Sequence, residues 1–261
     1  MTLSYNRITE LFKRKPSGIL SVYCTAGYPS LNDTVPLVGA MQSAGADMVE
    51  IGIPFSDPVA DGPTIQGSNE QALRNGMSLE RLMAQLKDLR PAVNIPALLM
   101  GYVNPIIQYG AENFCRDAAE AGIDGVIIPD LPPEVYLREF EHFFRSFNIL
   151  NILLVTPQTT DERIRWIDSI STGFIYAVSS SAITGGRLAV DQQRSAYLLR
   201  LSQLKLKNPL LVGFGVSSRE DCLEIGKYAS GVIIGSAFIR AINASSDAAA
   251  SARDFIKGVV L

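Results

Sequence analysis

The sequence is poor in the residues on which metal and disulfide chemistry depend. It holds one histidine, His142, and three cysteines, Cys24, Cys115 and Cys222, without the close Cys/His spacing of a zinc site. An odd number of scattered cysteines is typical of reduced thiols in a cytoplasmic protein. His142 falls in an amphipathic helical pattern, where a surface or packing role is expected. We therefore predict a cytoplasmic chain without a metal ion.

Three further absences exclude classes of partner. No apolar run reaches the ~20 residues that a membrane helix needs. The start, MTLSYNRITELFKRK, has no apolar core ahead of a cleavage site, so a signal peptide is not expected. The formal net charge is −3, whereas a nucleic-acid-binding face is basic. We expect neither a membrane nor a nucleic acid as partner.

What the sequence does contain is a series of short, continuously apolar runs. Continuous apolarity is typical of parallel strands that are buried on both faces. The runs are GILSVYC (18–24), DMVEI (47–51), PALLM (96–100), DGVII (124–128), ILNILLV (149–155), GFIYAV (173–178), PLLVGF (209–214) and GVIIG (231–235).

Helical patterns separate these runs. They cover 33–44, 64–74, 78–90, 110–121, 133–147, 161–170, 191–204, 218–228, 236–243 and 247–258. Strands that alternate with helices form a parallel sheet, and eight strands can close it. We predict an α/β protein, a (β/α)₈ TIM barrel forming one domain over residues 1–261. ITELFKRK is predicted as an extra N-terminal helix covering the barrel bottom, and a doubly wound open sheet is the alternative.

The segment VEIGIPFSDPVADGPTIQ (49–66) holds the strongest candidates for chemistry. Glu50 lies inside an apolar strand, where burial would raise the pKa of its carboxyl into the range of a general acid or base. A structural carboxylate satisfied by hydroxyls or amides is the equally weighted alternative. In the Pro- and Gly-rich loop that follows, Asp57 fits a turn or N-cap role. Asp61 is less easily explained by such a role.

Three late segments suggest a site for a phosphate ester. In 179–189, 213–220 and 233–240, glycine and hydroxyl residues follow a strand and precede a helix. Freed backbone amides and helix N-termini bind anions, and barrels often hold phosphate after strands 7 and 8. Ordinary N-caps are the alternative for the last two segments. The first, continued to SSSAITGGRLAVDQQ (179–193), is long and rich in small residues, as in a lid that closes over substrate. Simple surface disorder is its alternative.

No lysine lies at a predicted strand end, so a Schiff base or bound pyridoxal phosphate is not expected in this chain. The remaining groups are carboxylates, a tyrosine such as Tyr176, and the anion site. Together they suit acid–base cleavage of a phosphorylated substrate.

The run EIGIPFSDPVADGPTIQ (50–66) closely resembles the corresponding segment of tryptophan synthase alpha chains. Further pieces agree with that family in the same order along nearly the whole chain. They are TAGYP (25–29), LLMGYVNP (98–105), GVIIPDLP (125–132), Tyr176 with the following VSS, TGG (184–186), GFGVS (213–217) and IIGSA (233–237).

The resemblance implies cofactor-free retro-aldol cleavage of indole-3-glycerol phosphate into indole and glyceraldehyde 3-phosphate. Glu50 would protonate the indole ring and help to deprotonate the glycerol hydroxyl, while Asp61 would bind the indole N–H and stabilise the cation. Thr184 matches a lid residue that contacts this aspartate. The implied phosphate contacts are Gly185, Gly213, Phe214, Gly215, Gly235 and Ser236, and the implied indole contacts are Tyr23, Leu99, Tyr102 and Tyr176.

The resemblance also implies a partner, a pyridoxal-phosphate-dependent beta subunit in an αββα heterotetramer, with 53–61 and 102–108 facing it. Two positions depart from the family pattern. Ser180 stands where Arg is common, which puts charge contacts of the lid in doubt, and Tyr23 stands where Phe is common, in the indole pocket. Alternatives are another phosphate-binding barrel enzyme, a catalytically silent subunit, and a lyase that acts without a beta subunit.

Overall fold

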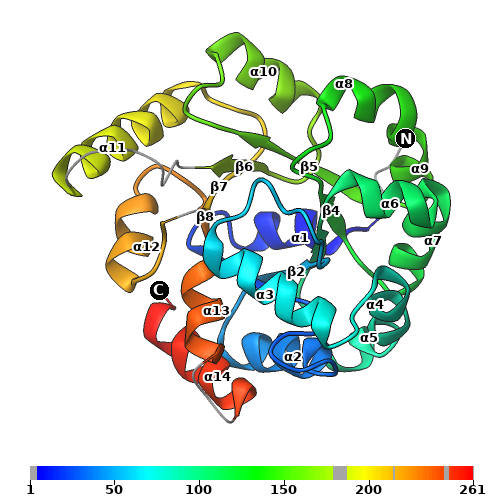
Figure 1. Ribbon diagram of the computed structural model, residues 1–261. Helices are drawn as coiled ribbons and strands as arrows, with labels where there is room; N and C mark the ends of the chain where they lie inside the picture. Colours follow the sequence, from blue (N-terminus) through cyan, green and yellow to red (C-terminus); the bar gives the residue numbers. More distant parts are fainter. Residues whose placement is uncertain (1–4, 179–186, 214, 244–246, 261) are drawn as a thin grey trace.

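A closed parallel barrel forms the centre of the computed structural model, which describes residues 5–178, 187–213, 215–243 and 247–260. The strands follow one another in chain order, and β1 pairs with both β2 and β8 (Figure 1). The (β/α)₈ TIM barrel is therefore confirmed over the open sheet. The strands are β1 (Ile19–Thr25), β2 (Met48–Gly52), β3 (Ala97–Met100), β4 (Gly125–Ile127), β5 (Leu150–Val155), β6 (Ile175–Val178), β7 (Leu210–Gly213) and β8 (Gly231–Ile234).

Helices surround the barrel (Figure 1). They are α1 (Arg7–Arg14), α2 (Thr34–Ala44), α3 (Pro63–Arg74), α4 (Leu79–Leu86), α5 (Leu89–Ala92), α6 (Val103–Tyr109), α7 (Ala111–Glu120), α8 (Pro133–Val135), the π-helix η1 (Tyr136–Phe140), α9 (Glu141–Ser146), α10 (Asp161–Ile170), α11 (Arg187–Gln203), α12 (Arg219–Ile225), α13 (Ser236–Asn243) and α14 (Ala248–Val259). No helix within the described ranges is both long and apolar enough to span a bilayer.

Two helical predictions need correction, and proline explains both. The helix predicted over 78–90 is split into α4 and α5, because Pro91 lacks an N–H and its ring clashes with the carbonyl four residues earlier. The pattern predicted no helix over 103–109, yet α6 forms there. Its Pro105 occupies the first turn, where a missing N–H costs nothing, so the Asn-Pro pair begins a helix.

The barrel interior is an apolar cluster separate from the core between barrel and helices. Side chains alternate along each strand, so every second residue points inward. Ile8 and Leu11 of α1 pack into the same cluster, which confirms that the N-terminal helix covers the barrel bottom. The inward strand residues are Ile19, Met48, Leu98, Ile127, Leu150, Ile152, Tyr176, Leu211 and Ile233, and Phe174, just before β6, joins them.

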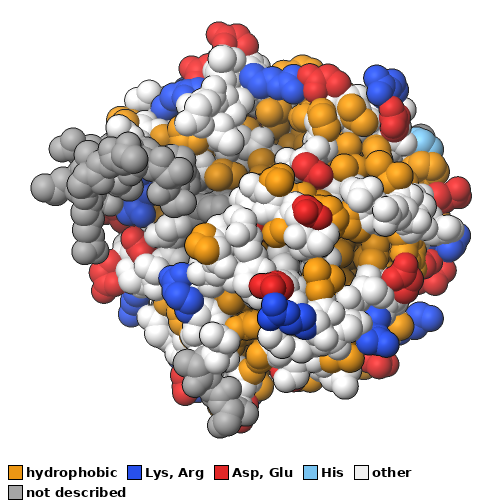
Figure 2. All heavy atoms as spheres, viewed as in Figure 1, with side chains coloured by type: hydrophobic (Ala, Val, Ile, Leu, Met, Phe, Trp, Pro, Cys, Tyr) orange, Lys and Arg blue, Asp and Glu red, His pale blue; other side chains and the backbone are white. Residues whose placement is uncertain are grey.

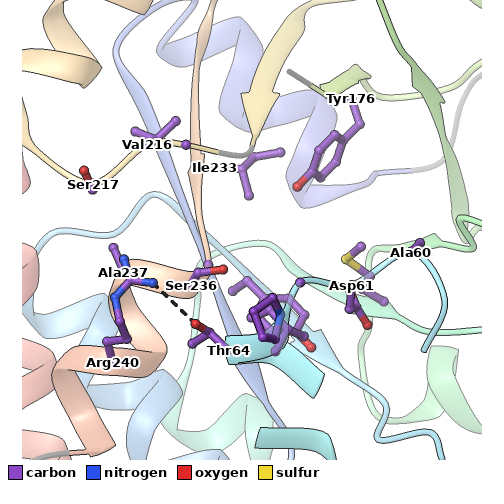
Figure 3. Close-up of a pocket in the computed structure, with 17 residues that line it drawn as sticks. Ala60, Asp61, Thr64, Tyr176, Val216, Ser217, Ile233, Ser236, Ala237 and Arg240 are labelled. Carbon is purple, nitrogen blue, oxygen red and sulfur yellow. Dashed lines mark hydrogen bonds between the residues drawn. The ribbon is translucent and has the colours of Figure 1, made fainter. Parts of the chain in front are cut away.

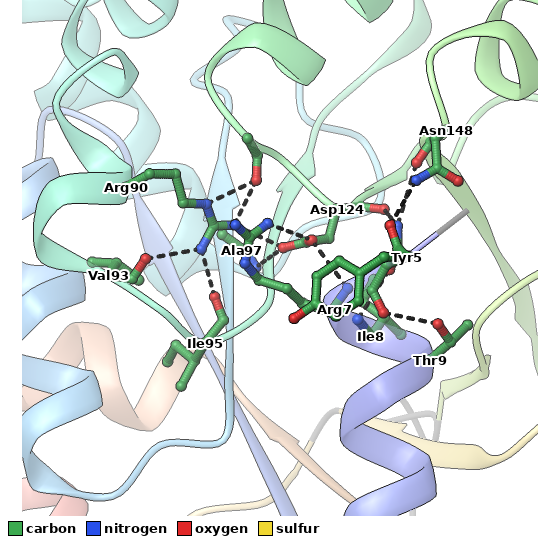
Figure 4. Close-up of polar contacts among 12 residues, drawn as sticks. Tyr5, Arg7, Ile8, Thr9, Arg90, Val93, Ile95, Ala97, Asp124 and Asn148 are labelled. Atoms are coloured by element: carbon green, nitrogen blue, oxygen red, sulfur yellow. Dashed lines mark hydrogen bonds and ion pairs between the residues drawn. The ribbon is translucent and has the colours of Figure 1, made fainter. Parts of the chain in front are cut away.

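A buried ion-pair cluster fastens α1 to the bottom of the barrel (Figure 4). Asp124, just before β4, is 3% exposed and accepts hydrogen bonds from Arg7 at 3.1 Å and Arg90 at 2.7 Å. The backbone N–H of Ala97 donates to the same carboxylate at 3.0 Å. This cluster lies where β3 and β4 begin. The cluster that stabilises α1 is therefore at the N-terminal ends of the strands, and a functional site can form from the loops at their C-terminal ends.

Candidate active site

A pocket of about 570 Å³ opens where the strands end (Figure 3). Tyr176 and Asp61 lie on one side of it, and Ser217, Ser236 and Arg240 on the other. Six of the residues implied by the resemblance line it: Tyr23, Asp61, Tyr176, Gly215, Gly235 and Ser236. The sequence did not point to several others, namely Thr64, Ile65, Met100, Val216, Ile233 and Arg240. The predicted C-terminal placement thus brings the early carboxylate loop and the late glycine loops to one cavity.

Glu50 is fully buried in β2. The hydroxyl of Ser21, on the neighbouring strand β1, donates to its Oε1 at 2.8 Å, whereas Oε2 has no hydrogen-bond partner. Burial raises the pKa of Glu50 from 4.5 to about 7, although the bond from Ser21 lowers it. A carboxyl with such a pKa can both give and take a proton near neutral pH.

Asp61 lies at the end of the β2–α3 loop, where side chains of two other elements hold it. The hydroxyl of Tyr102 donates to its Oδ2 at 3.1 Å. Asn69, a buried residue of α3, also forms a side-chain hydrogen bond to it. Burial raises the pKa of Asp61 above its usual value, whereas both hydrogen bonds lower it. Tyr102 itself does not line the pocket, so its contact with the site is through Asp61.

Two tyrosine rings of the pocket are packed against glycines. A Cβ on Gly52 would lie 2.1 Å from the Tyr23 hydroxyl, and one on Gly213 would lie 2.3 Å from the Tyr176 hydroxyl. Any larger residue at these glycines would displace the rings. Burial raises the pKa of both tyrosines above the usual value, and the charges of Asp61 and, for Tyr176, of Glu50 raise it further. Both hydroxyls are therefore neutral at physiological pH.

Leu99 lies away from the pocket, in the core between the barrel and the helices. Its neighbour Met100 lines the pocket instead. Alternate residues of β3 face opposite sides of the sheet, so adjacent positions cannot both face the cavity. The segment LLM was apolar throughout, which is why the sequence did not show which face each side chain occupies.

Glycine and serine form the opposite end of the pocket. Gly235 and Ser236 stand at the start of α13, whose N-terminal amides and dipole favour an anion. Gly215 has a φ of +72°, a conformation that favours glycine. Ser218, by contrast, caps α12 in a capping box with Asp221, which also accepts from Ser217. The N-cap alternative therefore holds for this segment, with Ser218 rather than Ser217 as the cap, and both serines bond to Asp221.

The side chain of Arg240 reaches this end of the pocket from α13, with its Nη1 3.4 Å from the Thr64 hydroxyl (Figure 3). Thr184, Gly185 and Phe214 lie outside the described residues, as does most of the predicted lid. Within the described part of the chain, no group of three or more His, Cys, Asp or Glu side chains is placed to hold a metal. Glu50 is not among the residues that line the pocket; the strand register pairs it with Tyr23, which does line it. The described pocket thus combines the Asp61 carboxylate with an anion-binding end.

Comparison with known proteins places this pocket in context. Residues 10–258 match the family model described as tryptophan synthase alpha chain. The chain is 52% identical to the tryptophan synthase alpha chain of Flavobacterium johnsoniae over 240 residues, covering 92% of this chain and 94% of that protein. It is 51% identical to that of Parabacteroides distasonis, over 92% of this chain and 94% of the relative.

Solved structures agree. The crystal structure of tryptophan synthase subunit alpha from Legionella pneumophila has a TM-score of 0.88 and 34% identity, covering 98% of this chain and 97% of that one. A chain of the aminoacrylate-bound tryptophan synthase from M. tuberculosis has a TM-score of 0.86 and 31% identity, covering 98% of both chains.

Proposed function

Because the chain belongs to the tryptophan synthase alpha chain family, we propose that its pocket cleaves indole-3-glycerol phosphate into indole and glyceraldehyde 3-phosphate, with Glu50 and Asp61 as catalytic groups. The observation that carries the assignment of roles is Glu50. Its carboxyl is fully buried, one oxygen lacks a partner, and its pKa of about 7 suits proton transfer in both directions.

Breaking the carbon–carbon bond makes indole a leaving group, which requires a proton on the ring. Protonated Glu50 supplies this proton, and the carboxylate that remains accepts the proton of the glycerol hydroxyl as its carbonyl forms. Asp61 acts in its ionised form, because it accepts the indole N–H and stabilises the positive charge that develops there. The hydrogen bonds from Tyr102 and Asn69 favour that ionised form.

The two ends of the pocket provide the remaining proposed contacts, one end with the indole ring and the other with the phosphate. Tyr23, Tyr176 and Met100 supply an apolar surface for the indole, and Tyr102 orients Asp61. The phosphate binds to the amides around Gly215, between β7 and α12, and around Gly235 and Ser236 at the α13 N-terminus. Gly213 leaves room for the Tyr176 ring. Thr184, Gly185 and Phe214 complete the proposal from the resemblance alone.

A beta subunit is the proposed partner, in an αββα heterotetramer that carries pyridoxal phosphate in the beta subunit. Two exposed apolar residues support a docking surface beside the pocket: Val59 in the β2–α3 loop is 85% exposed, and Ile107 in α6 is 56% exposed. Phe55 stacks on Tyr102 with ring centroids 5.2 Å apart, which joins this loop to the start of α6. Figure 2 shows hydrophobic side chains gathered over α6 and α8 on the same face.

We further propose that residues 1–261 act as one cytoplasmic domain without a cofactor of their own. Pairing of β1 with β8 joins the two ends of the described chain in one sheet, which supports the single domain. All three cysteines are free and buried, which supports a reducing compartment.

Indole release from indole-3-glycerol phosphate tests the proposal. We would assay wild type, Glu50→Gln and Asp61→Asn, each with and without a beta subunit, and check folding by circular dichroism. Glu120→Gln and Asp254→Asn are matched controls, because both carboxylates are exposed on outer helices. We expect wild type and controls to release indole, and both site variants to lose about 10²–10⁴-fold in kcat. Wild type that stays inert with a beta subunit would favour the silent-subunit or other-barrel reading.

A further inference from the structure

Ser21 places a hydroxyl group inside the barrel. Along β1, alternate residues Ile19, Ser21 and Tyr23 share the inward face; Ile19 belongs to the interior apolar cluster and Tyr23 lines the pocket. Ser21 is fully buried between them. An apolar residue would fill this position without the cost of burying a hydroxyl, so the hydroxyl calls for an explanation of its own.

The hydroxyl is bonded to one particular oxygen of Glu50. It donates a hydrogen bond to Oε1, with an oxygen–oxygen distance of 2.8 Å. The register pairs Ser21 with Met48 and Tyr23 with Glu50, so the carboxyl reaches diagonally back along the barrel interior to meet Ser21. Oε2, equally buried, has no partner. The two oxygens of the carboxyl are therefore not equivalent.

This asymmetry has a consequence for proton transfer. A neutral carboxyl can carry its proton on either oxygen, but a proton on Oε1 would compete with the proton that Ser21 donates there. With Ser21 as the donor, the neutral form holds its proton on Oε2, and the ionised form keeps Oε2 as its open acceptor. A fixed orientation of this kind removes conformations in which the proton faces away from the substrate.

We propose that Ser21 is a positioning residue for the cleavage reaction: its hydroxyl holds Oε1 of Glu50, so that Oε2 is the oxygen that gives the proton to the indole ring and takes one from the glycerol hydroxyl. The inference rests on the proposed function of Glu50 and adds which atom acts and what fixes it.

Ser21→Ala tests this role, with Ser171→Ala as matched control. Ser171 is also a buried serine, but its hydroxyl has no partner and it ends α10, outside the pocket. We expect Ser21→Ala to lower kcat about tenfold, as for loss of a hydrogen bond to a charged group, with KM within about twofold. Ser171→Ala keeps wild-type kinetics. Ser21→Thr, which restores a hydroxyl, recovers most of kcat.

The pH profile separates positioning from a merely structural role. Cleavage begins from protonated Glu50, so kcat/KM falls as the pH rises through the pKa of this residue. Ser21 stabilises the ionised form, so Ser21→Ala moves this alkaline limb upward by about one pH unit. An unchanged limb and wild-type kcat in a folded Ser21→Ala variant would overturn the proposal. If alanine prevents folding, Ser21→Cys, with its weaker donor, must show the same direction of change.

A measurement without turnover keeps the two proposals distinguishable. Carbon-13 NMR of labelled glutamate carboxyls follows the titration of Glu50 directly, with the signal assigned by its loss in Glu50→Gln. The Glu50 pKa rises in Ser21→Ala and stays unchanged in Ser171→Ala if the inference is right. Equal titration in wild type and Ser21→Ala rejects it. Inert wild type, by contrast, would reject the proposed function while leaving this titration result intact.

Discussion

The hydroxyl of Tyr102 binds two consecutive residues of the β2–α3 loop, because it donates to Oδ2 of Asp61 at 3.1 Å and accepts from the backbone N–H of Ala60 at 3.0 Å. Its ring stacks on Phe55 of the same loop. Tyr102 is also the N-cap residue of α6. One side chain therefore fixes the second carboxylate and the segment that carries it.

Tyr102→Phe keeps the ring stack but removes both hydrogen bonds of the hydroxyl. The bond to Asp61 lowers the pKa of this carboxyl, so its loss raises that pKa and less of the reactive anion is present at low pH. We expect kcat/KM to fall about 10- to 100-fold and its acid limb to move to higher pH. A steady-state pH profile of indole release measures both effects.

Tyr109→Phe is the matched control for this prediction. Tyr109 likewise donates to an aspartate, Asp117, but the pair lies on α6 and α7 outside the pocket. The control should keep the wild-type profile. If Tyr102→Phe also keeps it, Asp61 does not depend on this hydroxyl for its position or charge.

The raised pKa of Glu50 predicts a pH-dependent cost to stability. Its folded-state pKa of about 7 lies above the model-peptide value of 4.5, so the folded protein holds this proton more tightly than the unfolded chain does. Stability is therefore lost as the pH rises from about 4.5 to about 7, and the loss is constant above that window. At 1.36 kcal/mol per pH unit, the full cost is about 3 kcal/mol.

Glu50→Gln removes this cost, because the amide stays neutral. We expect the free energy of unfolding of the variant to exceed that of wild type by up to about 3 kcal/mol at pH 8, with the difference vanishing near pH 4. Urea titrations at several pH values give the curve, and Glu120→Gln on the outer surface should show no such trend. A difference that is constant with pH would mean that Glu50 titrates at its ordinary value.

The strands could be predicted closely because strands buried on both faces are apolar throughout, and each predicted run contains or overlaps the strand observed. Glu50 also stood out, since a carboxylate within such a run is rare. The side chains that shift the pKa values of the two carboxylates did not stand out in the sequence. Ser21 and Asn69 contact the two carboxylates through the barrel interior and from α3, and a linear sequence does not show such contacts. The choice between Leu99 and Met100 likewise depends on strand orientation.

Gly213→Ala tests the packing that places Tyr176. The added Cβ would meet the Tyr176 hydroxyl at 2.3 Å and two ring carbons at 2.6 Å, so the ring has to leave its present position in the pocket. We expect KM for indole-3-glycerol phosphate to rise at least tenfold, by the loss of roughly 1.4 kcal/mol of binding. Gly39→Ala in α2 is the control, since nothing lies within 4 Å of its Cβ, and helix propensity predicts a gain of up to about 1 kcal/mol in stability. Wild-type KM in Gly213→Ala would show that the pocket does not need Tyr176 where it lies.

Asp124 is a residue whose substitution should lower the stability of the protein without changing its catalytic activity. Its carboxylate is 3% exposed and receives Arg7 and Arg90, and its backbone oxygen accepts from Asn6 at 2.9 Å, all at the bottom of the barrel (Figure 4). Asp124→Ala leaves two arginines without this partner, and breaking a buried ion pair from one side costs about 3–5 kcal/mol. We expect a lower urea midpoint and, at a temperature where the variant is folded, a kcat for indole release equal to that of wild type.

Glu10→Gln is the control for the loss of an ion pair, because Glu10 pairs with Lys13 on the exposed side of α1. Such surface pairs contribute about 0–1 kcal/mol, so this variant should unfold close to wild type. An unchanged midpoint in Asp124→Ala would mean that α1 is held by Ile8 and Leu11 in the apolar interior rather than by the ion pairs. A fall in kcat of the folded variant would instead mean that the bottom of the barrel influences the carboxylates at its top, through the interior cluster that separates them.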